Sequence, residues 1–205
     1  MDRIILFDID KTIFDRDNFL GSFDDLLQEE FKLSNNELED IVSIYDGIKN
    51  DFGYFSPQAY LERIYKIVPS LNKKLDYYFG QENINKYLFQ DSEVLFSLKD
   101  IRVGIFSKGD IGFQKMKIAK FLDILEEDLI YVFHDKLKKL PQVLNSNRDS
   151  KLYLVDDKID VLVAAKDIDE NIKTIHIDHE GKLQKPNGVD FKLKNLSDII
   201  SILHE

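Results

Sequence analysis

Residues 4–12 read Ile4-Ile5-Leu6-Phe7-Asp8-Ile9-Asp10-Lys11-Thr12, four apolar residues that run directly into a pair of aspartates. A strand that is apolar at every position is typical of a parallel sheet covered on both faces. The two aspartates follow where this strand ends, and period-two geometry places both carboxylates on one side of an extended chain. Two adjacent carboxylates repel each other, so the pattern indicates a nearby cation, and Mg²⁺ suits a site of oxygen ligands.

Similar apolar runs recur further along the chain, at residues 103–106, 129–133, 152–155 and 174–177. Helical patterns lie between them; Phe113, Met116 and Ala119, for example, are spaced three apart. Alternating strands and helices predict βαβ units, and therefore an α/β fold with a three-layer, Rossmann-like parallel sheet core. Near the C-terminus we expect Ser197 to be the N-cap of a last helix.

The stretch at residues 16–87 has a different pattern, because it contains helical spacing but no convincing buried strand. Ser34-Asn35-Asn36-Glu37 is a capping box, and Ser56-Pro57 is a second helix start. We therefore predict an all-helical module inserted after the first strand. Within it, the polar, glycine-containing segment 46–54 is expected to be a loop that faces the cleft.

Three further predicted strand ends carry polar residues. Ser107 follows the second strand, where a hydroxyl near a helix N-terminus can hold a phosphate oxygen. Lys136 follows the third strand, and Asp156 and Asp157 close the fourth. Each alone is usually a cap, a loop residue or solvated surface. In open α/β sheets ligands bind at the carboxyl ends of the strands, so the ordered set indicates one shared site.

With these residues the chain resembles the haloacid dehalogenase-like (HAD) hydrolase superfamily over essentially its whole length. Asp8-x-Asp10-x-Thr12 resembles the first family motif, and the serine, the lysine and the acidic pair resemble the second, third and fourth in order. The inserted helices look like the family's helical cap domain. The resemblance implies a cap at residues 16–87 and a HAD-like α/β core domain at residues 1–15 and 88–205.

Two positions in this resemblance stay open. The third-motif lysine is placed at Lys136 because it comes soonest after its strand, although Lys138 and Lys139 follow closely. The fourth motif of the family often pairs an acidic residue with another four positions later, which favours Asp156, whereas strand alignment favours Asp157. Both aspartates are therefore kept as candidate metal ligands.

The resemblance implies a Mg²⁺-dependent phosphatase, a phosphoric monoester hydrolase that acts on a small phosphorylated metabolite. Asp8 would be the nucleophile that forms an aspartyl-phosphate, and Asp10 would protonate the leaving oxygen and then activate water. The candidate phosphate-binding residues are Thr12, Ser107, Lys108 and Lys136. The candidate metal ligands are Asp8, Asp10 through its backbone carbonyl, Asp156 and Asp157.

Two other functions remain open at this stage. A phosphomutase of the same superfamily would use the same residues. A phospho-accepting module without turnover would also use a strand-end aspartate, a hydroxyl, a lysine and Mg²⁺, but receiver domains are shorter and carry no helical insert. A dehalogenase does not need the acid/base carboxylate at Asp10, so this residue favours a phosphatase.

The composition limits the classes of molecule that the chain is expected to bind. The chain has 205 residues, a net charge of −10 and no cysteine. Such acidity argues against a broad nucleic-acid-binding face, and the missing cysteines exclude disulfides and thiolate metal sites. The N-terminal apolar run is too short for a signal peptide, and no run is long enough for a membrane span. We expect a cytoplasmic monomer or homodimer whose partner is a small-molecule phosphate ester, with no membrane or nucleic acid bound.

Overall fold

The computed structural model describes residues 2–182 and 184–204 and confirms the α/β fold. One all-parallel sheet has the strand order β3-β2-β1-β4-β5-β6. Its strands are β1 (Arg3–Phe7), β2 (Arg102–Lys108), β3 (Ile130–Phe133), β4 (Lys151–Asp156), β5 (Lys173–Ile177) and β6 (Phe191–Leu193). The first five match the predicted apolar runs. The edge strand β6 is absent from the prediction because it consists of three half-buried residues and has no apolar run of its own.

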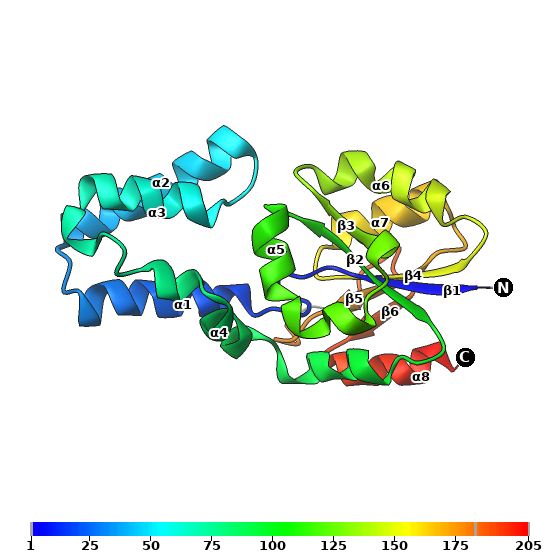
Figure 1. The fold of residues 1–205 in the computed structure, drawn as a ribbon. Helices are drawn as coiled ribbons and strands as arrows, with labels where there is room; N and C mark the ends of the chain where they lie inside the picture. The colour runs from blue at the N-terminus through cyan, green and yellow to red at the C-terminus, as the bar shows by residue number, and fades with distance from the viewer. Residues whose placement is uncertain (1, 183, 205) are drawn as a thin grey trace.

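Helices cover both faces of the sheet, which gives the predicted three layers (Figure 1). The core helices are α5 (Ile111–Lys117), α6 (Lys136–Ser146), α7 (Ile159–Ile168) and α8 (Ile199–Leu203). Ile4 and Leu6 of β1 belong to the apolar cluster formed with α6 and α7, whereas Ile5 and Phe7 belong to the cluster on the other face with α8. Because β1 is buried from both sides, all four of its apolar positions are explained.

The stretch between β1 and β2 is helical, and its first three helices form a lobe at one end of the molecule (Figure 1). The helices between β1 and β2 are α1 (Arg16–Asp25), α2 (Asn35–Phe52), α3 (Pro57–Ile67) and α4 (Gln81–Ile84). The same stretch contains a π-helical turn at Leu26–Glu30 and 3-10 turns at Pro69–Leu71, Asp76–Phe79, Asn85–Tyr87 and Gln90–Ser97. The chain enters and leaves this lobe side by side, because Phe14 forms an antiparallel bridge with Leu88. The N–H of Phe89 also donates to the carbonyl of Ile13 at 2.9 Å.

The predicted helix starts in this lobe are confirmed. Ser34 and Glu37 form the capping box, with the Ser34 N–H 2.8 Å from the Glu37 carboxylate, and Ser56 caps α3. The loop predicted at residues 46–54 is wrong over most of its length, because α2 continues to Phe52 and ends at Gly53, whose φ of 75° is left-handed. The predicted cap Ser197 is also wrong.

At that C-terminal helix start, Asn195 has the capping role that the sequence assigns to Ser197. The Asn195 side chain accepts a hydrogen bond from the Ser197 N–H at 2.8 Å and begins a 3-10 turn, Leu196–Asp198, that leads into α8. Asparagine and serine are comparably good N-caps, so the residue types alone do not distinguish two candidates that lie two positions apart.

Gly104 in the middle of β2 leaves no room for a side chain. A Cβ there would lie 2.6 Å from the Leu129 carbonyl oxygen and 2.8 Å from Cδ2 of Leu6. Gly104→Ala should therefore lower the free energy of unfolding by about 1–3 kcal/mol, measured by urea denaturation. Gly21→Ala is the matched control, because nothing lies within 4 Å of a Cβ in that exposed part of α1, and it should stabilise by about 0.5–1 kcal/mol. Equal stabilities of the two variants would contradict this packing.

Candidate active site

Four adjacent strands bring the predicted residues to one edge of the sheet. β3, β2, β1 and β4 are neighbours and run parallel, so their carboxyl ends lie together. Asp8 follows β1 directly, and its N–H donates to the carbonyl of Val155 in β4 at 2.8 Å. The chain proceeds from β1 to β2 on one side and later adds β4 on the other. This is a topological switch point, where α/β sheets bind their ligands.

Lys136 connects two of these strand ends. It is the first residue of α6 and only 4% exposed, and its Nζ donates to Asp8 at 2.7 Å and to Asp156 as well. Burial alone would lower the pKa of Lys136, but the charges of Asp156 and Asp8 outweigh it and raise the pKa. Lys136 is therefore held as a cation. Lys138, by contrast, is exposed and pairs with Asp135.

Asp8, Asp156 and Asp157 form an acidic cluster in which one carboxylate oxygen from each lies within 4.8 Å of the others. Both oxygens of Asp156 are used, one by Lys136 and one by the N–H of Lys158 at 3.0 Å. Oδ1 of Asp157 is buried and has no hydrogen-bond partner among the described residues. The two aspartates therefore differ, since only Asp157 has a free buried oxygen.

The charge in this cluster is only partly compensated. Burial raises the pKa of Asp156 to about 7, with a further contribution from Asp8. Burial, again together with Asp8, raises the pKa of Asp157 to about 6. Three carboxylates around one lysine leave excess negative charge, and all their donor atoms are oxygens. A hard divalent cation such as Mg²⁺ fits this donor set and would offset that charge.

Asp10 has a separate set of partners. Its Oδ1 accepts from Nζ of Lys117 at 2.6 Å, and its Oδ2 accepts from Nε2 of Gln114 at 3.1 Å. Lys117 is itself buried, with its Nζ 4.9 Å from the ring centre of Phe14 and 4.4 Å from that of Phe113. Burial would raise the pKa of Asp10, but Lys117 and Gln114 lower it below its ordinary value. The free protein thus holds Asp10 as a carboxylate.

Two buried hydroxyls at the site have no hydrogen-bond partner among the described residues, Oγ of Ser107 and Oγ1 of Thr12. Ser107 is 1% exposed but lines the cavity in front of Asp8. A buried hydroxyl without a partner costs free energy unless a ligand or water completes it. Thr12 does not line this cavity, and its backbone carbonyl lies 3.1 Å from Nε2 of His179. Thr12 therefore belongs to the loop that shapes the site.

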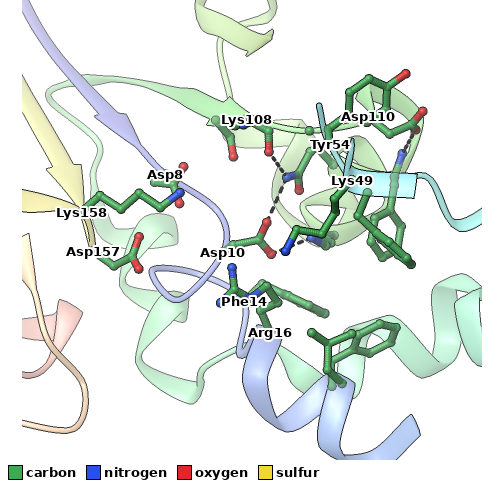
Figure 2. Close-up of a pocket in the computed structure, with 18 of the residues that line it drawn as sticks. Asp8, Asp10, Phe14, Arg16, Lys49, Tyr54, Lys108, Asp110, Asp157 and Lys158 are labelled. Carbon is green, nitrogen blue, oxygen red and sulfur yellow. Dashed lines mark hydrogen bonds and ion pairs between the residues drawn. The ribbon is translucent and has the colours of Figure 1, made fainter. Parts of the chain in front are cut away.

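Five of the predicted residues line a cavity of about 260 Å³ between the sheet edge and the helical lobe. Figure 2 shows Asp8, Asp157 and Lys158 on one side of Asp10, and Lys49 and Tyr54 on the other. Of the predicted residues, those that line it are Asp8, Asp10, Ser107, Lys108 and Asp157. Lys136 and Asp156 lie behind Asp8, in contact with it or with each other.

Several lining residues were missed by the sequence reasoning. From the core they are Gly109, Asp110, Phe113, Gln114, Lys117 and Lys158, and from the insert and the loop before it Phe14, Arg16, Phe19, Leu20, Tyr45 and Phe55. Only a weak signal existed for two of them. Gln114 and Lys117 are three apart and therefore share one face of α5, but their spacing does not show that this face is buried. Lys49, Gly53 and Tyr54 also line the cavity, as expected for a segment 46–54 that faces the cleft, although most of that segment is helical rather than a loop.

A scan against protein-family models and a search of curated proteins each found no match. Among solved structures, a haloacid dehalogenase-like hydrolase of Burkholderia xenovorans aligns with 97% of this chain and 97% of its own, at 21% identity and a TM-score of 0.74. A HAD-hydrolase of Bacillus subtilis bound to magnesium aligns over 100% of this chain and 99% of its own length, at 14% identity and a TM-score of 0.60. An L-2-haloacid dehalogenase of Xanthobacter autotrophicus aligns with 100% and 99%, at 13% identity and a TM-score of 0.59.

Within residues 2–182 and 184–204, the helices are all too short or too polar to cross a lipid bilayer.

Proposed function

We propose that this chain, which has the fold of haloacid dehalogenase-like hydrolases, is a Mg²⁺-dependent phosphatase that hydrolyses a small phosphate monoester. The observation that carries the proposal is the buried Ser107 hydroxyl, which has no partner and lines the same cavity as Asp8. A phosphoryl oxygen would accept a hydrogen bond from that hydroxyl, while the neighbouring Lys108 adds positive charge. In the resting cavity a carboxylate nucleophile and an anion-binding group thus face the same space.

Asp8 is the proposed nucleophile. One of its oxygens attacks phosphorus and the bond from phosphorus to the ester oxygen breaks, which leaves an aspartyl-phosphate that water then hydrolyses. Lys136, 2.7 Å from Asp8, fixes the carboxylate and offsets the charge that gathers during transfer. Ser107 and Lys108 would orient the phosphoryl oxygens, because both line the cavity.

Asp10 is the proposed acid and base. It would give a proton to the departing ester oxygen and later take one from the attacking water. Because Lys117 lowers its pKa, Asp10 is ionised in the free protein and must acquire a proton before the first step. An anionic substrate entering the cavity favours that protonation, since it adds negative charge near the carboxylate.

Mg²⁺ would be held by Asp8 and Asp157, with the backbone carbonyl of Asp10 completing the protein ligands. The free buried oxygen of Asp157 supports this residue over Asp156 as the direct ligand. Asp156, engaged by Lys136 and by a backbone N–H, would position that lysine instead. When bound, the metal offsets the repulsion between an anionic nucleophile and an anionic substrate.

We further propose that residues 16–87 act as a cap over a core of residues 1–15 and 88–205. Insert residues line the cavity opposite the reacting groups, so the cap would exclude water and select the substrate. One structural relative is a haloacid dehalogenase. The acid/base carboxylate at Asp10, held at both oxygens, favours phosphate transfer over dehalogenation for this chain.

The test is release of inorganic phosphate from p-nitrophenyl phosphate by the purified protein. We expect turnover with Mg²⁺, a loss of at least about 100-fold after treatment with EDTA, and recovery when Mg²⁺ is added back, because the carboxylate cluster cannot otherwise accept a phosphate dianion. A parallel assay measures chloride release from 2-chloropropionate. Chloride release without phosphate release would overturn the proposal and identify a dehalogenase.

A further inference from the structure

The cavity holds more positive charge than one phosphoryl group requires. Lys108, Lys117 and Lys158 line it from the core, while Arg16 and Lys49 line it from the insert. Lys117 is paired with Asp10 and Arg16 with Asp17. Lys108 and Lys158 are placed to meet the reacting phosphoryl group. Lys49, on the far side of Asp10 from Asp8 in Figure 2, is not assigned to the reacting phosphoryl group. In a chain with a net charge of −10, a lysine turned toward a cavity without an acidic partner requires an explanation.

Lys49 is unpaired although acidic residues surround it in sequence. Nearby on the insert, Arg63 pairs with Asp51 at 2.7 Å and Arg16 pairs with Asp17 at 3.1 Å. Over the described ranges, no carboxylate oxygen lies within 4.0 Å of Lys49. Its Nζ instead lies 4.9 Å from the ring centre of Tyr45, which also lines the cavity. An aromatic face holds an ammonium in place without neutralising its charge.

The end of α2 that carries Lys49 is anchored to the core. The ring of Tyr54 stacks on His134, with centroids 4.2 Å apart and planes at 25°. His134 lies between β3 and Lys136, so this contact connects the insert to a loop of the active site. The remaining insert lining near Lys49 includes the apolar side chains of Phe19, Leu20 and Phe55. The insert lines the cavity with two cations, Arg16 and Lys49, and of these Arg16 is already paired with Asp17.

We propose that the substrate carries a second anionic group, a carboxylate or a second phosphoryl group, that binds Lys49 while the reacting phosphoryl group lies at Asp8 and Ser107. The inference rests on the proposed phosphatase function for the reacting end. Lys49 is exposed in this structure, so its attraction for a second anion strengthens when a substrate that fills the cavity displaces water from around both charges. The cavity of about 260 Å³ restricts such a substrate to a small molecule.

The experiment compares three esters that share a three-carbon chain: propyl phosphate, 2-carboxyethyl phosphate and propane-1,3-diol bisphosphate. The two esters that carry a second anionic group distinguish a preference for a carboxylate from a preference for a second phosphoryl group. We expect the native protein to favour at least one of them over propyl phosphate in kcat/KM by about 10-fold or more. Lys49→Met should lower that ratio about 10-fold, and Lys49→Arg should retain most of it, because the charge is kept.

Lys66→Met is the matched control, since Lys66 is an exposed lysine of α3 that does not line the cavity, and it should keep the native ratio. A native ratio near one, or a ratio that Lys49→Met leaves unchanged, would overturn the inference. A binding assay separates this failure from that of the proposed function. Calorimetry with propylphosphonate, 3-phosphonopropionate and propane-1,3-diyl bisphosphonate needs no turnover. A preference for either ligand with a second anionic group that is lost in Lys49→Met supports the second anion site even without phosphatase activity, and no preference for either refutes it.

Discussion

Asp8→Asn should abolish phosphate release, lowering kcat/KM by at least ~10³-fold, while the protein stays folded. The amide is a poor nucleophile, yet it has nearly the same shape and its oxygen can still accept the hydrogen bond from Lys136. The substitution also removes one of three carboxylates that crowd the cluster, so no loss of stability is expected. Phosphate release and urea denaturation on the same preparation measure both effects.

Asp149→Asn provides the control for Asp8→Asn. Asp149 has a side chain that is 95% exposed and makes only a marginal contact with Arg148 at 4.0 Å. The same change of functional group there should leave both activity and stability as in the native protein. Native turnover in a well-folded Asp8→Asn protein would mean that phosphoryl transfer does not use this aspartate, and the proposed mechanism would be abandoned.

The second large effect is expected at Lys136. Lys136→Met retains the length and apolar stem of the side chain but leaves the buried carboxylates of Asp8 and Asp156 without their cation. Breaking a buried ion pair from one side costs about 3–5 kcal/mol, because the remaining charges are uncompensated. We expect that loss in the free energy of unfolding, together with loss of phosphatase activity.

Added Mg²⁺ gives this prediction a second readout. A cation bound to the native state stabilises it by mass action, and it should stabilise Lys136→Met more than the native protein because more negative charge is left to offset. Lys138→Met is the matched control on the same helix, since Lys138 is 83% exposed and pairs with a half-exposed Asp135. Lys138→Met should lower the free energy of unfolding by at most about 1 kcal/mol. Equal costs at the two positions would show that Lys136 does not neutralise the cluster.

The sequence was sufficient for the sheet and for the core side of the site. β1, β2 and β4 are buried on both faces, so their apolar runs mark them clearly, and Asp8, Ser107 and Asp157 are found by counting to the strand ends. The half-buried strand β6 has no such run and was missed. Strand ends are local properties of the chain, which is why they can be predicted without the tertiary structure.

The partners of Asp10 could not be found by the same reasoning. Lys117 and Gln114 come from α5, more than a hundred residues away, and meet Asp10 only when α5 packs beside the motif loop. A periodicity argument reads the apolar face of a helix and treats its polar residues as solvated. Lys49 lies in the segment 46–54 that was expected to face the cleft, but it was not singled out, because the segment was expected to be a loop and α2 instead carries Lys49 on its last turn.

The paired crossing at Phe14 and Leu88 has a consequence for how such proteins diversify. The segments that enter and leave the insert are hydrogen-bonded side by side. The core therefore requires only that these two segments meet, whatever the length of the chain between them. The helical module can then be lengthened, shortened or exchanged without moving β1 relative to β2. Selection for new substrates would thus act on the inserted helices while the strand-end residues of the core stay in place.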